Sequence, residues 1–133
     1  MKLTINTDGG ARGNPGPAGI GVVIKDQSGK ILKEYGKYIG ERTNNEAEYE
    51  AVISALESAK EFEPRMIEFR LDSELVNRQI NGIYKVKEKR MQELYMKVRD
   101  LLIHFKNINF FHVPREQNRE ADRLVNEAID KHE

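Results

Sequence analysis

The chain has 133 residues, a length typical of one domain, and its 22 Lys and Arg residues equal its 22 Asp and Glu residues. It lacks cysteine, which excludes disulfides and thiolate metal sites, and no apolar run approaches the ~20 residues of a membrane span. The first residues become polar too early for a secretory signal. We therefore expect one domain over residues 1–133, a cytoplasmic location, no membrane contact and a monomer.

Three strands are predicted in the first third of the chain. Alternation of apolar and polar residues predicts a half-buried strand at 2–8, which runs into a glycine-rich turn at 9–17. Strands are also predicted at 19–25 and 30–39, on either side of a polar turn. These three strands should therefore form an antiparallel meander.

A helix and a fourth strand follow. Apolar residues at helical spacing predict a helix that Thr43, Asn44 or Asn45 can cap and that Pro64 ends. The fourth strand is predicted at 66–72, where alternate apolar residues share one side. Both elements should therefore bury one face.

Three more helices and a strand complete the predicted fold. Ser73 can cap a short helix that ends near residues 81–82, and a long amphipathic helix begins near Glu88. A fifth strand at 108–113 precedes a last helix that Asn118 can cap. This order predicts an α/β fold with a five-stranded mixed sheet and helices packed on both faces.

Four carboxylates occupy positions that are unusual for solvated side chains. Asp8 and Asp72 each end a strand, on the side opposite to its clear hydrophobic residues. Glu48 lies on the apolar face of the first helix, and Asp122 lies at the edge of the last helix's apolar stripe. Buried carboxylates are costly unless they are paired or bind a metal, and they suit Mg²⁺ or Mn²⁺. The pattern predicts a metal-dependent phosphoryl-transfer enzyme.

Ordinary explanations remain open for three of these acids. Asp8 could be a turn residue, Asp72 could cap a helix beside Ser73, and Asp122 could be a surface acid at a helix N-terminus. Glu48 is harder to explain, because the helix dipole alone gives no reason for an acid on the apolar face. Glu48 therefore favours a functional site. Because the other three acids accompany it, a functional role is favoured for them as well.

The charge of the chain is unevenly distributed. Residues 85–106 carry seven Lys or Arg against three acids. From charge alone, a solvated helix face is the favoured interpretation. A surface that contacts nucleic-acid phosphates is the alternative.

Four motifs follow one another in order over nearly the whole chain. They are Thr7-Asp8-Gly9-Gly10 with Gly13-Asn14-Pro15-Gly16-Pro17, Thr43-Asn44-Asn45-Glu46-Ala47-Glu48, Leu71-Asp72-Ser73, and Asn118-Arg119-Glu120-Ala121-Asp122. Together they resemble type-1 ribonuclease H (RNase HI), in particular its compact archaeal and bacterial branch. The resemblance implies an RNase H-like fold and an endoribonuclease that cleaves the RNA strand of RNA–DNA hybrids, leaving 5′-phosphate and 3′-hydroxyl ends.

The resemblance also implies the metal site. Two Mg²⁺ ions, with Mn²⁺ as an alternative, would lie ~4 Å apart, activate a water and stabilise the leaving oxygen. Without metal, the crowded carboxylates should raise one or more of the pKa values in the site. The metal ligands implied are Asp8, Glu48, Asp72 and Asp122.

The implied substrate contacts are amides, a threonine and glycines. Amides can both donate to and accept from the 2′-hydroxyl that distinguishes RNA from DNA, and glycines let the backbone approach a minor groove closely. Thr43 resembles a residue that binds a DNA-strand phosphate, while helix capping is the simpler role of Asn44 and Asn45. The substrate-binding residues implied are Gly9, Gly10, Gly13, Asn14, Thr43, Asn44, Asn45 and Ser73.

Two departures from the family pattern matter. The loop at 113–118 has no histidine, so Arg115 is the better catalytic candidate for assisting product or metal release, and His112 is interpreted as structural. Residues 81–90 are too short for the basic protrusion of some members. Binding of the hybrid would then depend on four basic residues, Lys85, Lys87, Lys89 and Arg90.

Two rival functions remain open. One is a non-catalytic module that binds hybrids or duplexes on the same fold, although an intact set of acids would weaken binding to phosphates unless cations intervene. The other is a nuclease for a different duplex, such as double-stranded RNA or a DNA junction.

Overall fold

The computed structural model describes residues 1–133, and its elements follow the predicted order. No helix is both long enough and apolar enough to cross a membrane. The strands are β1 (Lys2–Ala11), β2 (Gly16–Lys25), β3 (Ile31–Arg42), β4 (Met66–Leu71) and β5 (Ile108–His112). The helices are α1 (Asn44–Ala59), α2 (Glu74–Ile80), α3 (Lys89–Leu102) and α4 (Arg119–His132), with 3₁₀ turns η1 (Lys60–Phe62) and η2 (Arg115–Gln117).

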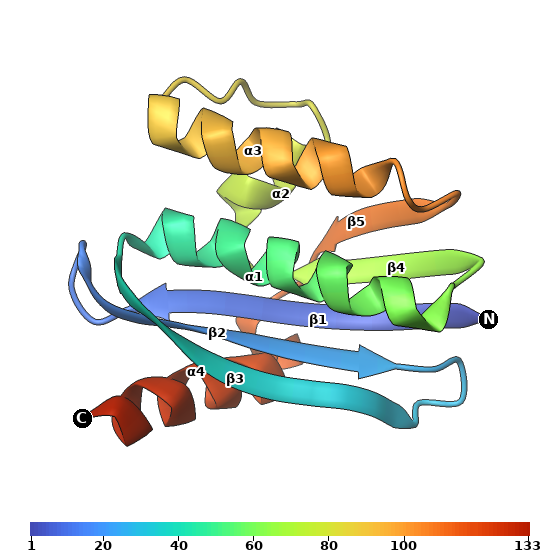
Figure 1. Cartoon of the computed structure of the whole chain (residues 1–133), viewed down its shortest axis with the longest axis horizontal. Helices are drawn as coiled ribbons and strands as arrows, with labels where there is room; N and C mark the ends of the chain where they lie inside the picture. Colours follow the sequence, from blue (N-terminus) through green and yellow to red (C-terminus); the bar gives the residue numbers. More distant parts are fainter.

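The five strands form one mixed sheet in the order β3-β2-β1-β4-β5 (Figure 1). The pairs β1–β2 and β2–β3 are antiparallel, while β1–β4 and β4–β5 are parallel. α1 covers one face of the sheet with α3 packed on it, and α4 covers the opposite face. The predicted mixed sheet with helices on both faces is therefore confirmed.

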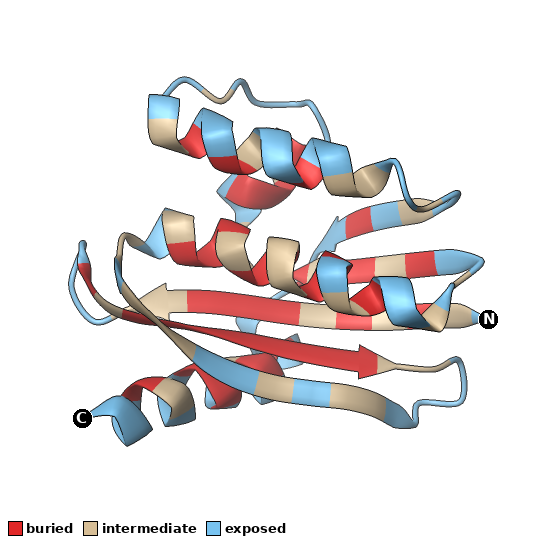
Figure 2. Cartoon of the chain, in the orientation of Figure 1, coloured by how far each residue is buried: buried red, intermediate tan, exposed pale blue.

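The two faces of the sheet are packed differently. Buried residues run along the central strands and the inner face of α1, where they form the main hydrophobic core with α3 (Figure 2). On the other face, α4 lies very close to the sheet: a Cβ at Gly21 would come within 2.2 Å of the Ala121 carbonyl oxygen, and one at Gly36 within 2.4 Å of the Leu124 carbonyl oxygen. The close approach of α4 therefore depends on these two glycines.

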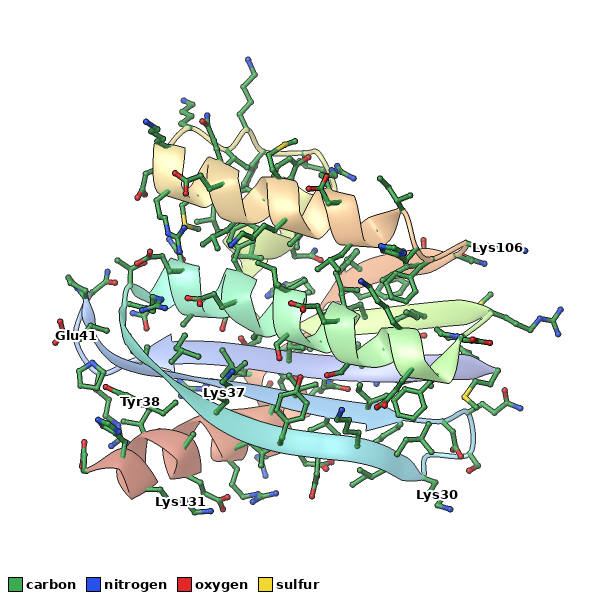
Figure 3. All side chains as sticks on the ribbon, in the orientation of Figure 1. Lys30, Lys37, Tyr38, Glu41, Lys106 and Lys131 are labelled. Atoms are coloured by element: carbon green, nitrogen blue, oxygen red, sulfur yellow. The ribbon has the colours of Figure 1, made fainter.

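The C-terminal end of α4 has its own contacts with the sheet and the β1–β2 loop. Tyr38 on β3, which is labelled in Figure 3, stacks on His132 with ring centroids 3.6 Å apart. Arg12, in the loop after β1, forms ion pairs with Asp130 at 2.6 Å and with Glu133 at 3.2 Å. These contacts hold the last turns of α4 beside the loop that joins β1 to β2.

Two local predictions were wrong. The glycine-rich turn was expected from residue 9, but Gly9 and Gly10 belong to β1 and pair with β2 as far as Ala11. Asn118 stands at the N-cap position of α4 but makes no side-chain cap. Its amide bonds to β1 instead, because the buried backbone of that strand offers it a partner.

Candidate active site

Three carboxylates meet where β1 and β4 end. Asp8 lies in β1, Glu48 in α1, and Asp72 directly after β4. The parallel register pairs Thr7 with Leu71, so the next residue of each strand, Asp8 and Asp72, reaches the same edge. One ligand oxygen from each of the three carboxylates lies within 4.8 Å of the others. The structure thus brings together the two strand-end acids and the helix acid, as their sequence positions predicted.

Glu48 is buried and oriented by the backbone of β1. The Gly9 N–H donates a 2.7 Å hydrogen bond to Glu48 Oε1. A Cβ on Gly9 would lie 2.2 Å from the backbone carbonyl of Ala47, so only glycine lets β1 and α1 approach this closely. Gly9 is itself buried, and packing against α1 is a reason for glycine that the sequence pattern did not indicate.

Burial and nearby acids disfavour the charged forms of Asp8 and Glu48. Burial is the largest cause that raises the pKa of Asp8, and Glu48, Asp72 and Asp122 raise it further. Burial also raises the pKa of Glu48, although the Gly9 N–H opposes this by stabilising the carboxylate. Without a cation, the buried pair therefore retains a proton well above the usual pH range for carboxyl groups, as predicted.

Asp122 and Arg115 form the outer part of the site. Arg115 Nη2 lies 3.7 Å from Asp122 Oδ1, and the Arg115 side chain is 79% exposed. Asp122 lies close enough to contribute to the raised pKa of Asp8 but stands outside the cluster of three acids. His112 was interpreted as structural, but it is exposed at the end of β5 and does not line the cavity.

A cavity of about 450 Å³ surrounds the acids. Arg12 and Asn126 also line it, although no sequence pattern singled them out: Arg12 is one residue of a polar loop, and Asn126 lies one helical turn after Asp122. The predicted site residues that line it are Asp8, Gly9, Gly10, Asn44, Asn45, Glu48, Asp72, Ser73, Arg115 and Asp122.

Three predicted substrate residues lie outside this lining and have structural roles close to it in the chain. Thr43 caps α1 in a reciprocal capping box with Glu46. Asn14 Oδ1 accepts a 3.0 Å hydrogen bond from the Asn44 N–H, and Gly13 has a φ of +116°, which glycine adopts readily. These residues fix the loop and the start of α1.

Asn44 and Ser73, which line the cavity, have local structural partners as well. Asn44 Oδ1 accepts a 2.8 Å hydrogen bond from the Ala11 N–H, which joins the end of β1 to α1. Ser73 caps α2 by accepting from the Val76 N–H at 3.2 Å, as predicted. Asn44 and Asn45 are nevertheless exposed, so their amides face the solvent at the cavity.

The donor set fits a hard divalent cation. Every candidate ligand is a carboxylate oxygen, and Mg²⁺ and Mn²⁺ prefer oxygen ligands. A bound cation would also lower the raised pKa values, because positive charge favours the ionised carboxylates.

Known proteins are similar to this chain in both sequence and fold. The Reverse transcriptase-like family matches residues 6–128. A Halobacterium salinarum protein named Ribonuclease HI is 45% identical over 92% of the chain, and a solved RNase H1 from that organism has a TM-score of 0.95 at 42% identity, covering 98% of this chain and 99% of that one. The chain belongs to the ribonuclease H family. LC11-RNase H1, isolated from compost and solved in complex with an RNA/DNA hybrid, matches with a TM-score of 0.94 at 53% identity over 98% of each chain.

The chain spans only part of some relatives of the ribonuclease H family. It covers 62% of the Halobacterium Ribonuclease HI and 36% of a mycobacterial bifunctional protein that is 43% identical. The family match, which begins before Asp8 and ends after Asp122, nevertheless spans the positions of all four carboxylates.

Proposed function

We propose that this chain is a ribonuclease H, a metal-dependent endoribonuclease that hydrolyses the RNA strand of RNA–DNA hybrids, and that residues 1–133 form its single catalytic domain. The observation that carries the proposal is the cluster of Asp8, Glu48 and Asp72, whose ligand oxygens lie within 4.8 Å of one another. A module that only binds nucleic acid gains nothing from buried acids beside a phosphate backbone. The hybrid bound by LC11-RNase H1 supports the choice of substrate.

In this proposal, the four carboxylates hold two divalent cations, Mg²⁺ or alternatively Mn²⁺. Bound cations supply an activated water and stabilise charge on the leaving oxygen. The Gly9 N–H keeps Glu48 oriented, and Arg115 places a cationic group beside Asp122 for release of the product. Water adds to phosphorus and the bond from phosphorus to the 3′ oxygen breaks, which leaves 5′-phosphate and 3′-hydroxyl ends.

Recognition of the RNA strand falls to the exposed amides at the rim. Asn44 and Asn45 face the cavity, and amides can exchange hydrogen bonds with a 2′-hydroxyl. Asn14 holds the Asn44 backbone, while Gly10 and Ser73 lie beside the acids. Double-stranded DNA should therefore not be cleaved. Double-stranded RNA is the main alternative substrate, because it also carries 2′-hydroxyls.

A basic segment beside α3 would hold the duplex. Lys85, Lys87 and Lys89 are all exposed, and Gln92 fixes the intervening backbone by donating to the Val86 carbonyl at 2.8 Å. Arg90 differs from these lysines because it is ion-paired with Glu46 at 3.2 Å. We therefore assign the phosphate contacts to the three lysines.

The test is a labelled RNA–DNA hybrid incubated with Mg²⁺, with and without a chelator, beside double-stranded RNA and double-stranded DNA. The proposal expects cleavage of the RNA strand that disappears under chelation, and almost no cleavage by Asp8→Asn, which should still fold and bind the hybrid. Binding without cleavage would favour the binding module, and preferred cleavage of double-stranded RNA would favour the other nuclease. The cytoplasmic location and the monomeric state stay predictions, which localisation of a tagged chain and light scattering can check.

A further inference from the structure

Asn118 is a buried amide that joins the last helix to the first strand. Its side chain is almost fully buried, with 2% exposure. Nδ2 of Asn118 donates a 2.8 Å hydrogen bond to the Thr7 carbonyl, and Oδ1 accepts a 3.0 Å hydrogen bond from Asn6 Nδ2. All the polar atoms of the amide side chain thus face β1, although Asn118 stands where a helix-capping side chain would normally bond to its own helix.

The backbone of Asn118 connects the two outer groups of the site. Its carbonyl accepts a 3.1 Å hydrogen bond from the Asp122 N–H, and its N–H donates to the Arg115 carbonyl at 2.9 Å. Thr7, which the side chain contacts, directly precedes Asp8. A short series of hydrogen bonds therefore runs from the strand that carries Asp8 to the turn that carries Arg115 and the helix that carries Asp122.

We propose that Asn118 is a positioning residue, which sets Asp122 and Arg115 at their working distance from Asp8. The close packing of α4 on Gly21 and Gly36 fixes how near the helix lies to the sheet. The directional bond from Asn118 to Thr7 adds a polar contact between β1 and the residue that precedes α4, one helical turn before Asp122. This inference rests on the proposed nuclease function.

The decisive variant is Asn118→Ala, compared with Asn6→Ala. Asn118→Ala removes both side-chain bonds, whereas Asn6→Ala leaves the bond to Thr7 in place. We expect Asn118→Ala to lower kcat on a saturating hybrid roughly 10–100-fold, as for groups that orient metal ligands, with KM within about twofold. Asn6→Ala should lower kcat much less. Asn118→Asp keeps an acceptor for Asn6 but cannot donate to Thr7 as a carboxylate, so it should not rescue kcat.

A second measurement separates positioning from general stability and needs no substrate. Calorimetric titration with Mn²⁺ should show weaker binding to Asn118→Ala than to the wild type. Val98→Ala, in the core of α3, is the control for lost stability, since it should lower the melting temperature while leaving kcat and Mn²⁺ affinity unchanged. All variants are assayed at a temperature where each is folded.

The outcomes are distinct from those of the nuclease proposal. If the wild type cleaves hybrids and Asn118→Ala keeps its kcat and Mn²⁺ affinity, the positioning role is overturned. The role is also overturned if Asn118→Ala and Val98→Ala lose kcat equally at equal loss of stability. If the wild type cleaves nothing, the proposed function fails, and the Mn²⁺ titration still tests the effect of Asn118 on the acids.

Discussion

Gly9 and Glu48 form a direct link between the sheet and the first helix, because the Gly9 N–H donates a 2.7 Å hydrogen bond to Glu48 Oε1. The absence of a side chain at Gly9 is what brings the two backbones close enough for this bond. One residue therefore serves both the packing of β1 on α1 and the orientation of a buried carboxylate. Substitutions at Gly9 should damage stability and activity together.

We expect Gly9→Ala to lower the free energy of unfolding by about 3 kcal/mol or more, because its Cβ would lie 2.2 Å from the Ala47 carbonyl and neither backbone can move aside cheaply. Gly10→Ala is the matched control for stability, since its Cβ would lie at an ordinary 3.5 Å from Val125 Cγ1. Its unfolding free energy should change by only about 0.5 kcal/mol. Urea unfolding measures both variants, and equal losses would contradict the packing argument.

The sequence was sufficient to predict the acids but not the contacts that orient them. Strand parity and strand ends selected Asp8 and Asp72, and helical periodicity placed Glu48 on a buried face, because both patterns are local. The contact of Asn118 with Thr7 spans 111 residues, and the clash that requires glycine at position 9 comes from a different element. Such contacts depend on how elements pack, which local periodicity does not record.

The stability of the metal-free protein should fall as pH rises from about 4.5 towards 7. Folding raises the pKa of Glu48 from its ordinary 4.5 to about 7, mainly by burial, and also raises the pKa of Asp8. In this range the folded protein binds more protons than the unfolded chain, so raising the pH favours unfolding. The change should be on the order of a few kcal/mol.

Thermal unfolding in EDTA at several pH values measures this effect. Glu48→Gln should weaken the pH dependence, because it removes one of the two buried carboxyls. Mg²⁺ should raise the melting temperature of the wild type at pH 8 more than that of Asp8→Asn, since the cation stabilises ionised carboxylates. A wild-type protein whose stability in EDTA rises between pH 5 and 7 would contradict the prediction.

Replacement of Arg115 should slow turnover more than replacement of His112. Arg115 lines the cavity 3.7 Å from Asp122, whereas His112 is exposed outside it. We expect Arg115→Ala to lower kcat roughly tenfold or more, because a cationic group at the reaction site is lost. Arg115→Lys should retain part of the rate, and His112→Ala should match the wild type. Steady-state kinetics on one hybrid provide the comparison, and the reverse ranking would assign the catalytic role to His112.

The exposed lysines of the segment before α3 should control affinity and its salt dependence rather than the chemical step. Each lysine that contacts a phosphate releases counterions, so Lys85→Ala and Lys87→Ala together should weaken hybrid binding and reduce the slope of log affinity against log salt by about one per lysine. The value of kcat at saturating substrate should not change. Lys106→Ala is the control, because this exposed lysine precedes β5 at the end of the sheet away from the acids (Figure 3). Equal effects of the two changes would point to overall charge instead of a defined contact surface.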